Sequence, residues 1–163
     1  MLELSPVALT IVACAGEAPA LDALATSAGG YACRIAPDEL WLLGAPGDGR
    51  RLLERARAGV VATGGLAETQ TDAWSVYAAA WPEAAELFAR LAAVPLGPER
   101  PVFVQCELVH VAGKALALAD RLYLLVPSPV GHQLEERILH GCRDLAPRRG
   151  PPVDFGAPAP GAA

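Results

Sequence analysis

The sequence predicts an α+β fold made of two ferredoxin-like βαββαβ repeats that pack about a pseudo-two-fold axis. The first observation is a duplicated segment: DELWLLGAPGDGRRLLER begins at Asp38, and DRLYLLVPSPVGHQLEER begins at Asp120. Eight of the eighteen positions are identical, and Trp41 is matched by Tyr123. The second observation is that each copy changes from an apolar run of strand length to helical spacing. The third is the order strand, helix, strand, strand, helix, strand, which is that of a split βαβ arrangement.

The first repeat is expected to occupy about residues 7–65. Asp48 lies where its side chain can accept hydrogen bonds from the first N–H groups of the second helix. The expected elements are a strand over 7–15, a helix with Leu21 and Leu24 on one face, strands over 31–36 and 39–44, a helix with Leu52, Leu53 and Ala56 on one face, and a short strand over 60–63.

The second repeat is expected over about residues 70–145. Its start aligns only weakly with the first repeat, at an offset of 63 that pairs Ala15 with Ala78 and Leu24 with Leu87. Ser128 is expected to cap the last helix, with Pro129 in its first turn. The expected elements are a strand within 72–80, a helix from Trp81-Pro82 with Ala84, Leu87, Phe88 and Leu91 on one face, strands over 102–111, 114–119 and 121–126, and a helix with Val130, Leu134 and Ile138 on one face.

The two repeats together form one duplicated domain over residues 1–145. The remainder, 146–163, is rich in Pro, Gly and Ala, and we expect it not to pack on its own. Its apolar anchors are Val153 and Phe155. We therefore expect this tail to become ordered along a partner protein.

Composition and charge exclude several classes of function. Thirteen Lys and Arg residues against eighteen Asp and Glu residues give a formal charge of −5. That balance argues against binding to nucleic acids or anionic membranes, which requires clustered basic residues. No apolar run reaches the roughly 18–20 residues of a membrane span, and no basic segment precedes the first apolar run, so we expect no signal peptide. The expected location is the cytoplasm, with the four cysteines reduced.

Few residues suggest chemistry, and we expect neither catalytic nor metal-binding residues on this chain. The sequence contains no nucleophile elbow, zincin motif or P-loop. His132 and His140 would lie about 12 Å apart along one helix, too far to share a metal ion. Asp38 and Asp120 occur in both copies of the duplicated segment and leave two interpretations open. They could form a catalytic carboxylate pair, or, as we favour, shape the tight turns in which they lie.

Three segments of the chain carry a resemblance to a known family. RIAPDELWLL, from Arg34, is similar to the R-x-x-P-D-E-W-L-L segment of sarcosine oxidase gamma subunits. TDAWSV from Thr71 is similar to a D-x-[ST]-x-[AG]-W-type strand found there and in the related aminomethyltransferase (glycine-cleavage T-protein) fold. LYLLVP from Leu122 resembles the strand that precedes the family's last helix. The chain departs from the pattern because it has no histidine beside Asp72.

The resemblance implies an aminomethyltransferase-like fold within a heterotetrameric flavoenzyme that oxidatively demethylates an N-methylated amine in sarcosine catabolism. It also implies that FAD, FMN, NAD and tetrahydrofolate are carried by the other, larger subunits and that this chain carries no cofactor. The first hypothesis is a non-catalytic subunit for assembly, with Trp74, Trp81, Val153 and Phe155 as candidate partner contacts. The alternatives are a stand-alone folate-binding one-carbon transferase, with Asp72 and Trp74 at the pterin, and a small ligand-binding or regulatory module.

Overall fold

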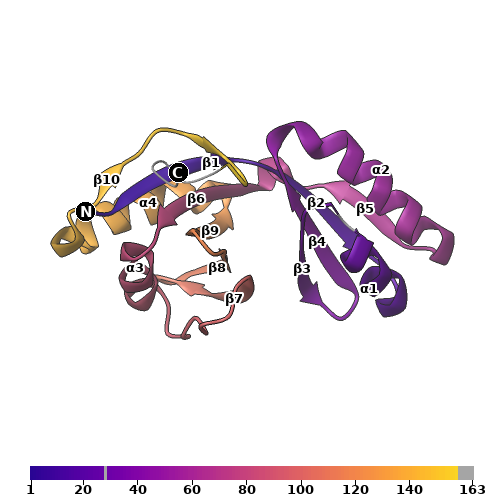
Figure 1. Cartoon of the computed structure of the whole chain (residues 1–163), viewed down its shortest axis with the longest axis horizontal. Coiled ribbons are helices and arrows are strands. Elements are labelled where there is room, and N and C mark those ends of the chain that lie inside the picture. The colour runs from indigo at the N-terminus through magenta and orange to yellow at the C-terminus, as the bar shows by residue number, and fades with distance from the viewer. Residues whose placement is uncertain (28, 158–163) are drawn as a thin grey trace. The chain divides into compact units, whose positions relative to one another are not determined.

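The computed structural model describes residues 1–27 and 29–157 and shows a mixed α+β protein with two sheets. The chain divides into two compact units. Unit 1 contains residues 1–7, 72–153 and 157, and unit 2 contains residues 8–71 and 154–156. Each unit has its own sheet and its own two helices (Figure 1).

Unit 2 is an antiparallel sheet with both helices on one face. The strand order is β3-β4-β2-β5. Alternate strand residues such as Val12, Cys14 and Leu42 are buried with Leu21 and Leu52 from the helices, which fixes the covered face. The elements are β2 (Thr10–Ala15), α1 (Ala18–Ser27), β3 (Tyr31–Ala36), β4 (Glu39–Gly44), a 3₁₀ turn (Pro46–Asp48), α2 (Gly49–Val60), a second 3₁₀ turn (Val61–Thr63) and β5 (Leu66–Thr69).

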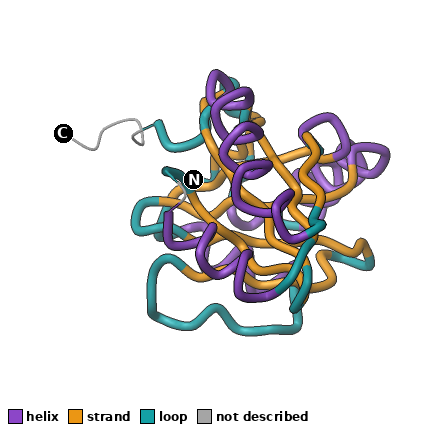
Figure 2. The backbone as a smooth tube through the Cα atoms, turned by 90° about the vertical axis from the view of Figure 1, so that its right-hand side faces the viewer, coloured by secondary structure: helices purple, strands orange, loops and turns teal. Residues whose placement is uncertain are grey.

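Unit 1 has the strand order β10-β1-β6-β9-β8-β7, with β11 also paired to β1. Its core lies between one face of this sheet and the two helices, where Leu4, Leu87, Leu124 and Ile138 are buried. Figure 2 shows the helices, strands and loops of the chain in separate colours. The elements are β1 (Glu3–Ala8), a 3₁₀ turn (Thr71–Ala73), β6 (Trp74–Ala80), α3 (Glu83–Leu91), β7 (Val102–Leu108), β8 (Val111–Ala117), β9 (Arg121–Pro127), a 3₁₀ turn (Ser128–Val130), α4 (Gly131–Gly141), a 3₁₀ turn (Arg143–Leu145), β10 (Arg148–Arg149) and β11 (Val153–Asp154).

The duplicated segment adopts the same local structure in both units. A strand, a 3₁₀ turn and a helix follow one another as β4 and α2 in unit 2 and as β9 and α4 in unit 1. The strands that pair with β4 and β9, namely β2 and β6, also do so in the same register: Ala15 faces Glu39, and Ala80 faces Arg121. The strands therefore correspond at an offset of 65, and the sequence alignment of Ala15 with Ala78 at 63 was wrong.

The offset of 63 holds for α1 and α3, the helices that follow β2 and β6. Leu24 and Leu87 are both buried against their sheets, and so are Leu21 and Ala84. The connection between strand and helix is thus two residues shorter in unit 1. A gapless alignment could match the strands or the helices, but not both.

The expected strand over 7–15 is two strands in different sheets. β1 and β2 are separated by Leu9, and β1 pairs with β6 of unit 1, while β2 pairs with β4 and β5 of unit 2. In unit 2, β5 lies on the free side of the first strand, β2; in unit 1, β1 lies on that side of β6. The N-terminal segment therefore completes the sheet of unit 1, which the expected repeat boundaries did not foresee.

Three local predictions differ from the structure. The short strand expected over 60–63 was wrong, because α2 runs to Val60 and a 3₁₀ turn follows. Asp48 and Ser128 stand at the expected helix starts, but neither side chain caps its helix. Asp48 instead accepts a hydrogen bond from Arg51 at 3.2 Å, and the Ser128 hydroxyl donates to the carbonyl oxygen of Asp72 at 2.8 Å.

The C-terminal tail packs on its own chain as far as residue 157, contrary to expectation. Arg148-Arg149 pair in parallel with β1, and β11 also pairs with β1. Phe155 is 5% exposed and makes an edge-to-face contact with Tyr31 in unit 2. The expected ordering on a partner can therefore concern only residues 158–163, which lie outside the described residues.

Candidate functional site

Asp72 and Trp74, the two residues suggested for folate, do not converge on one site. Trp74 lines a shallow hollow of about 370 Å³ between β6, β7 and β8, and the Lys114 ammonium lies 4.5 Å from the centre of its ring. Asp72 is exposed and does not line this hollow; its carbonyl oxygen accepts the Ser128 hydroxyl. Folate binding therefore stays a prediction.

The other candidate partner contacts lie at separate places. Trp81 is half-buried in unit 1, where its indole N–H donates to the carbonyl oxygen of Leu118 at 2.9 Å and Arg100 lies over its ring at 4.9 Å. Val153 is partly exposed, whereas Phe155 is buried by its own unit. The contact role of Trp74, Trp81 and Val153 stays a prediction, and Phe155 has little surface left for a partner.

Asp38 and Asp120 occupy turns between strands, in agreement with the favoured interpretation. The Asp38 carbonyl oxygen accepts the Gly16 N–H at 3.0 Å. The Asp120 carboxylate accepts the Nε–H of Arg121 at 2.8 Å. The two aspartates belong to different units. Trp41 and Tyr123, the matched aromatic residues, are 4% and 1% exposed and act as packing residues.

The histidines and cysteines are spread over the described residues without forming a group of three potential metal ligands. His110 contacts Glu107 at 2.9 Å, and His132 contacts Glu136 at 3.2 Å, both at the surface. His140 contacts the Glu136 carbonyl oxygen at 2.8 Å. All four cysteines are free thiols. No helix among the described residues is long and apolar enough to cross a bilayer.

The buried thiols of unit 2 should make its stability fall at alkaline pH. Burial raises the pKa of Cys14 to about 11 and that of Cys33 to about 12. An unfolded chain would release these protons near the ordinary value of 9.0, so the unfolded state gains stability as pH rises from about 9 towards 11. We expect the free energy of unfolding to decrease over this range.

Urea denaturation at several pH values checks this expectation. The Cys14→Ala/Cys33→Ala variant should show a shallower decrease than the unaltered chain. Equal slopes for the double variant and the unaltered chain would contradict the burial argument.

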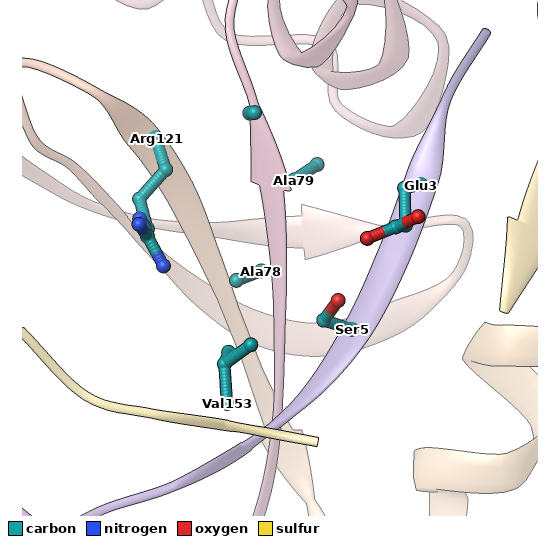
Figure 3. Close-up of a pocket in the computed structure, with 7 residues that line it drawn as sticks. Glu3, Ser5, Ala78, Ala79, Arg121 and Val153 are labelled. Carbon is teal, nitrogen blue, oxygen red and sulfur yellow. The ribbon is translucent and has the colours of Figure 1, made fainter. Parts of the chain in front are cut away.

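A site that the sequence did not reveal lies around Arg121, at the start of β9. Its side chain is 4% exposed. Among the side-chain nitrogen and oxygen atoms of the described residues, its Nη2 is the one that is buried without a hydrogen-bond partner. Arg121 lines a cavity of about 50 Å³ in unit 1 together with Glu3, Ser5 and Val153 (Figure 3). The sequence carries one indication of this site: the acidic Glu39 in the first copy of the duplicated segment corresponds to the basic Arg121 in the second copy.

The fold, rather than the sequence, connects the chain to known proteins. No protein-family model matches the chain, and no curated protein matches it in sequence. By structure, the chain has the mixed α+β, two-sheet fold of the aminomethyltransferase-like proteins.

Two solved structures illustrate the match. A chain of the heterotetrameric sarcosine oxidase from Corynebacterium sp. U-96, in complex with pyrrole 2-carboxylate, is similar with a TM-score of 0.76 and 13% identity; the match covers 89% of this chain and 85% of that chain. The glycine cleavage system aminomethyltransferase T from Bartonella henselae is similar with a TM-score of 0.62 and 13% identity, over 91% of this chain. The match covers 47% of that chain, about half of its length.

Proposed function

We propose that this chain is a small, non-catalytic subunit of a sarcosine oxidase-like heterotetrameric flavoenzyme that oxidatively demethylates an N-methylated amine. The observation that carries the proposal is the extent of the structural match. Nearly the whole of this chain corresponds to nearly the whole of one chain of a heterotetrameric sarcosine oxidase, whereas it corresponds to only half of the aminomethyltransferase. A separate subunit in a larger assembly accounts for this difference better than a complete transferase.

The pairing of the strands in the two units supports the prediction of two ferredoxin-like repeats. β2 pairs with β4 in unit 2 in the same register as β6 pairs with β9 in unit 1, and a 3₁₀ turn and a helix follow both β4 and β9. We propose that the units are two ferredoxin-like repeats related by a pseudo-two-fold axis, with β1 in unit 1 at the position that β5 has in unit 2. Such a duplicated unit can arise without an active site of its own.

We also propose that the cofactors of the complex, FAD, FMN, NAD and tetrahydrofolate, bind to the other subunits. Among the described residues, the hollow at Trp74 is shallow, and the small cavity at Arg121 has room for a few atoms only. Ligand clefts of about 300–1,000 Å³ enclose most of a cofactor-sized ligand. The hollow at Trp74, at about 370 Å³, has such a volume but is too open to enclose the ligand, and the cavity at Arg121, at about 50 Å³, is too small. These features support a role in assembly.

Co-expression with the flavin-bearing subunits tests the proposal. A tagged form of this chain should co-purify with them, and native mass spectrometry should show one copy in a four-subunit complex that retains its flavins. Omission of this chain should lower the yield or the amine oxidase activity of the remaining subunits. Trp74→Ala would test one candidate contact, with Val94→Ala as a control at another exposed site. A chain that stays monomeric beside those subunits would refute the proposal.

A further inference from the structure

The guanidinium of Arg121 is placed to bind a group that the chain itself does not supply. Its Nε–H donates to the Asp120 carboxylate at 2.8 Å. The buried Nη2 has no acceptor among the described residues. Most buried donors in folded proteins have a partner, and an unsatisfied one costs free energy. Such a donor is satisfied by a bound water or by an acceptor group from another molecule.

The strand register explains why Arg121 faces a cavity rather than a packed core. Arg121 lies opposite Ala80 in the ladder between β9 and β6, and Ser5 on β1 lies opposite Ala78 on the other side of β6. Small side chains on the middle strand therefore separate an arginine from a serine. Figure 3 shows Arg121 on one side of β6 and Glu3 and Ser5 on the other.

The size and lining of the cavity fit a small oxygen-bearing group. Its volume of about 50 Å³ has room for about three water-sized groups, since one water needs roughly 10–15 Å³. Ala78, Ala79, Ala80 and Val153 provide apolar walls, which strengthen an electrostatic interaction with Arg121. These dimensions match the three heavy atoms of a carboxylate.

The surrounding charges do not oppose an anion. Glu3 also lines the cavity, but its carboxylate is paired with the Arg148 guanidinium at 2.6 Å. Asp120 is 41% exposed, so solvent screens much of its charge. Guanidinium N–H groups match carboxylate oxygens in geometry and form hydrogen bonds that are stronger than neutral ones.

We propose that the cavity at Arg121 binds one carboxylate group through the free Nη2 of Arg121. The carboxylate comes either from a small organic acid or from an acidic side chain of a neighbouring subunit. The second source rests on the proposed function, whereas the first does not. The two sources require the same chemistry at Arg121 and are separated by experiment.

The first arm titrates the isolated full chain with sodium acetate at constant pH and ionic strength, and follows the backbone amide signals of Ser5 and Ala78 by NMR. We expect saturable shifts that are at least tenfold weaker in Arg121→Met, and weaker also in Ala80→Val, which narrows the cavity but keeps the charge. Arg143→Met, an exposed arginine of the same unit, should behave like the unaltered chain. Acetamide, which lacks the charge, should bind at least tenfold more weakly than acetate.

The second arm measures the affinity of the same variants for the co-expressed subunits. A Kd raised about tenfold or more in Arg121→Met, but not in Arg143→Met, would assign the carboxylate to a neighbouring subunit. An acetate response in the free chain with unchanged subunit affinity would assign it to a small acid. If the unaltered chain forms no complex, the proposed function fails and the acetate arm alone decides. No acetate response together with unchanged affinity, or equal binding of acetamide and acetate, overturns the carboxylate site.

Discussion

Removal of residues 1–7 is expected to abolish the fold of unit 1. β1 lies beside β6 and also pairs with β10 and β11, so its loss leaves β10 and β11 without a neighbouring strand and exposes one edge of β6. Leu2 and Leu4 are 1% and 0% exposed in the core of unit 1, and their removal would open it to water. Loss of strand pairing and loss of core packing act together, which makes this the largest effect that we predict.

A milder change at the same strand gives a measurable loss. Leu4→Ala should lower the free energy of unfolding by about 2–5 kcal/mol, because it leaves a cavity in the core. Pro6→Ala, at an exposed position on the same strand, should change it little. Urea denaturation measures both variants.

Hydrogen exchange locates the damage caused by the truncation. The amides of β6 and β9 should lose protection in the shortened chain and regain it when a peptide of residues 1–8 is added in excess. Protected β6 amides in the shortened chain without the peptide would show that unit 1 does not depend on β1.

The duplicated segment was the most predictable part of the fold. Its strand, turn and helix follow from a change of apolar period within eighteen residues, and that signal is local. The partner of each strand is not a local property. VALTIVACA, from Val7, is apolar except for Thr10 and has the length of one strand, yet the chain passes from one sheet to the other at Leu9. No spacing within the run marks that change.

The wrongly predicted strand over 60–63 has a physical cause in tertiary packing. Val60 and Val61 are β-branched and favour a strand when considered alone. Leu52, Ala56 and Val60, however, recur every four residues and are all fully buried, which keeps α2 helical as far as Val60. Gly64 then adopts φ of 78° and allows the chain to turn into β5.

The candidate site around Arg121 could not be predicted from the sequence for a different reason. The duplicated segment drew attention to identical positions, whereas Arg121 is a position at which the two copies differ. In unit 2 the equivalent Glu39 accepts the indole N–H of Trp41 at 2.8 Å. In unit 1 Tyr123 replaces that tryptophan, and the position holds a buried cation instead. The cavity itself depends on Ser5, which lies 116 residues away along the chain.

The second large effect is expected at Gly131, where alanine should destabilise the protein while alanine at the matched Gly49 should not. A Cβ atom on Gly131 would lie 2.4 Å from the Oγ and 2.5 Å from the Cβ of Ser75. On Gly49 the nearest atom would be the Thr10 Oγ1 at 3.4 Å, an ordinary contact. Both glycines have helical backbone angles, so only the space around them differs.

The expected magnitudes have opposite signs. Gly131→Ala should lower the free energy of unfolding by about 1–3 kcal/mol, because the first turn of α4 must move away from β6. Gly49→Ala should leave it unchanged or raise it by up to about 1 kcal/mol, since alanine favours the helix over glycine. Urea denaturation of the two variants at neutral pH makes the comparison.

A second substitution tests the assigned contact. Ser75→Gly removes both atoms that the new Cβ would meet, so it should recover part of the loss when it is combined with Gly131→Ala, as a double-mutant cycle would show. A loss at Gly131 that Ser75→Gly does not reduce would place the strain elsewhere. Equal effects at Gly131 and Gly49 would mean that α4 does not approach β6 more closely than α2 approaches β2.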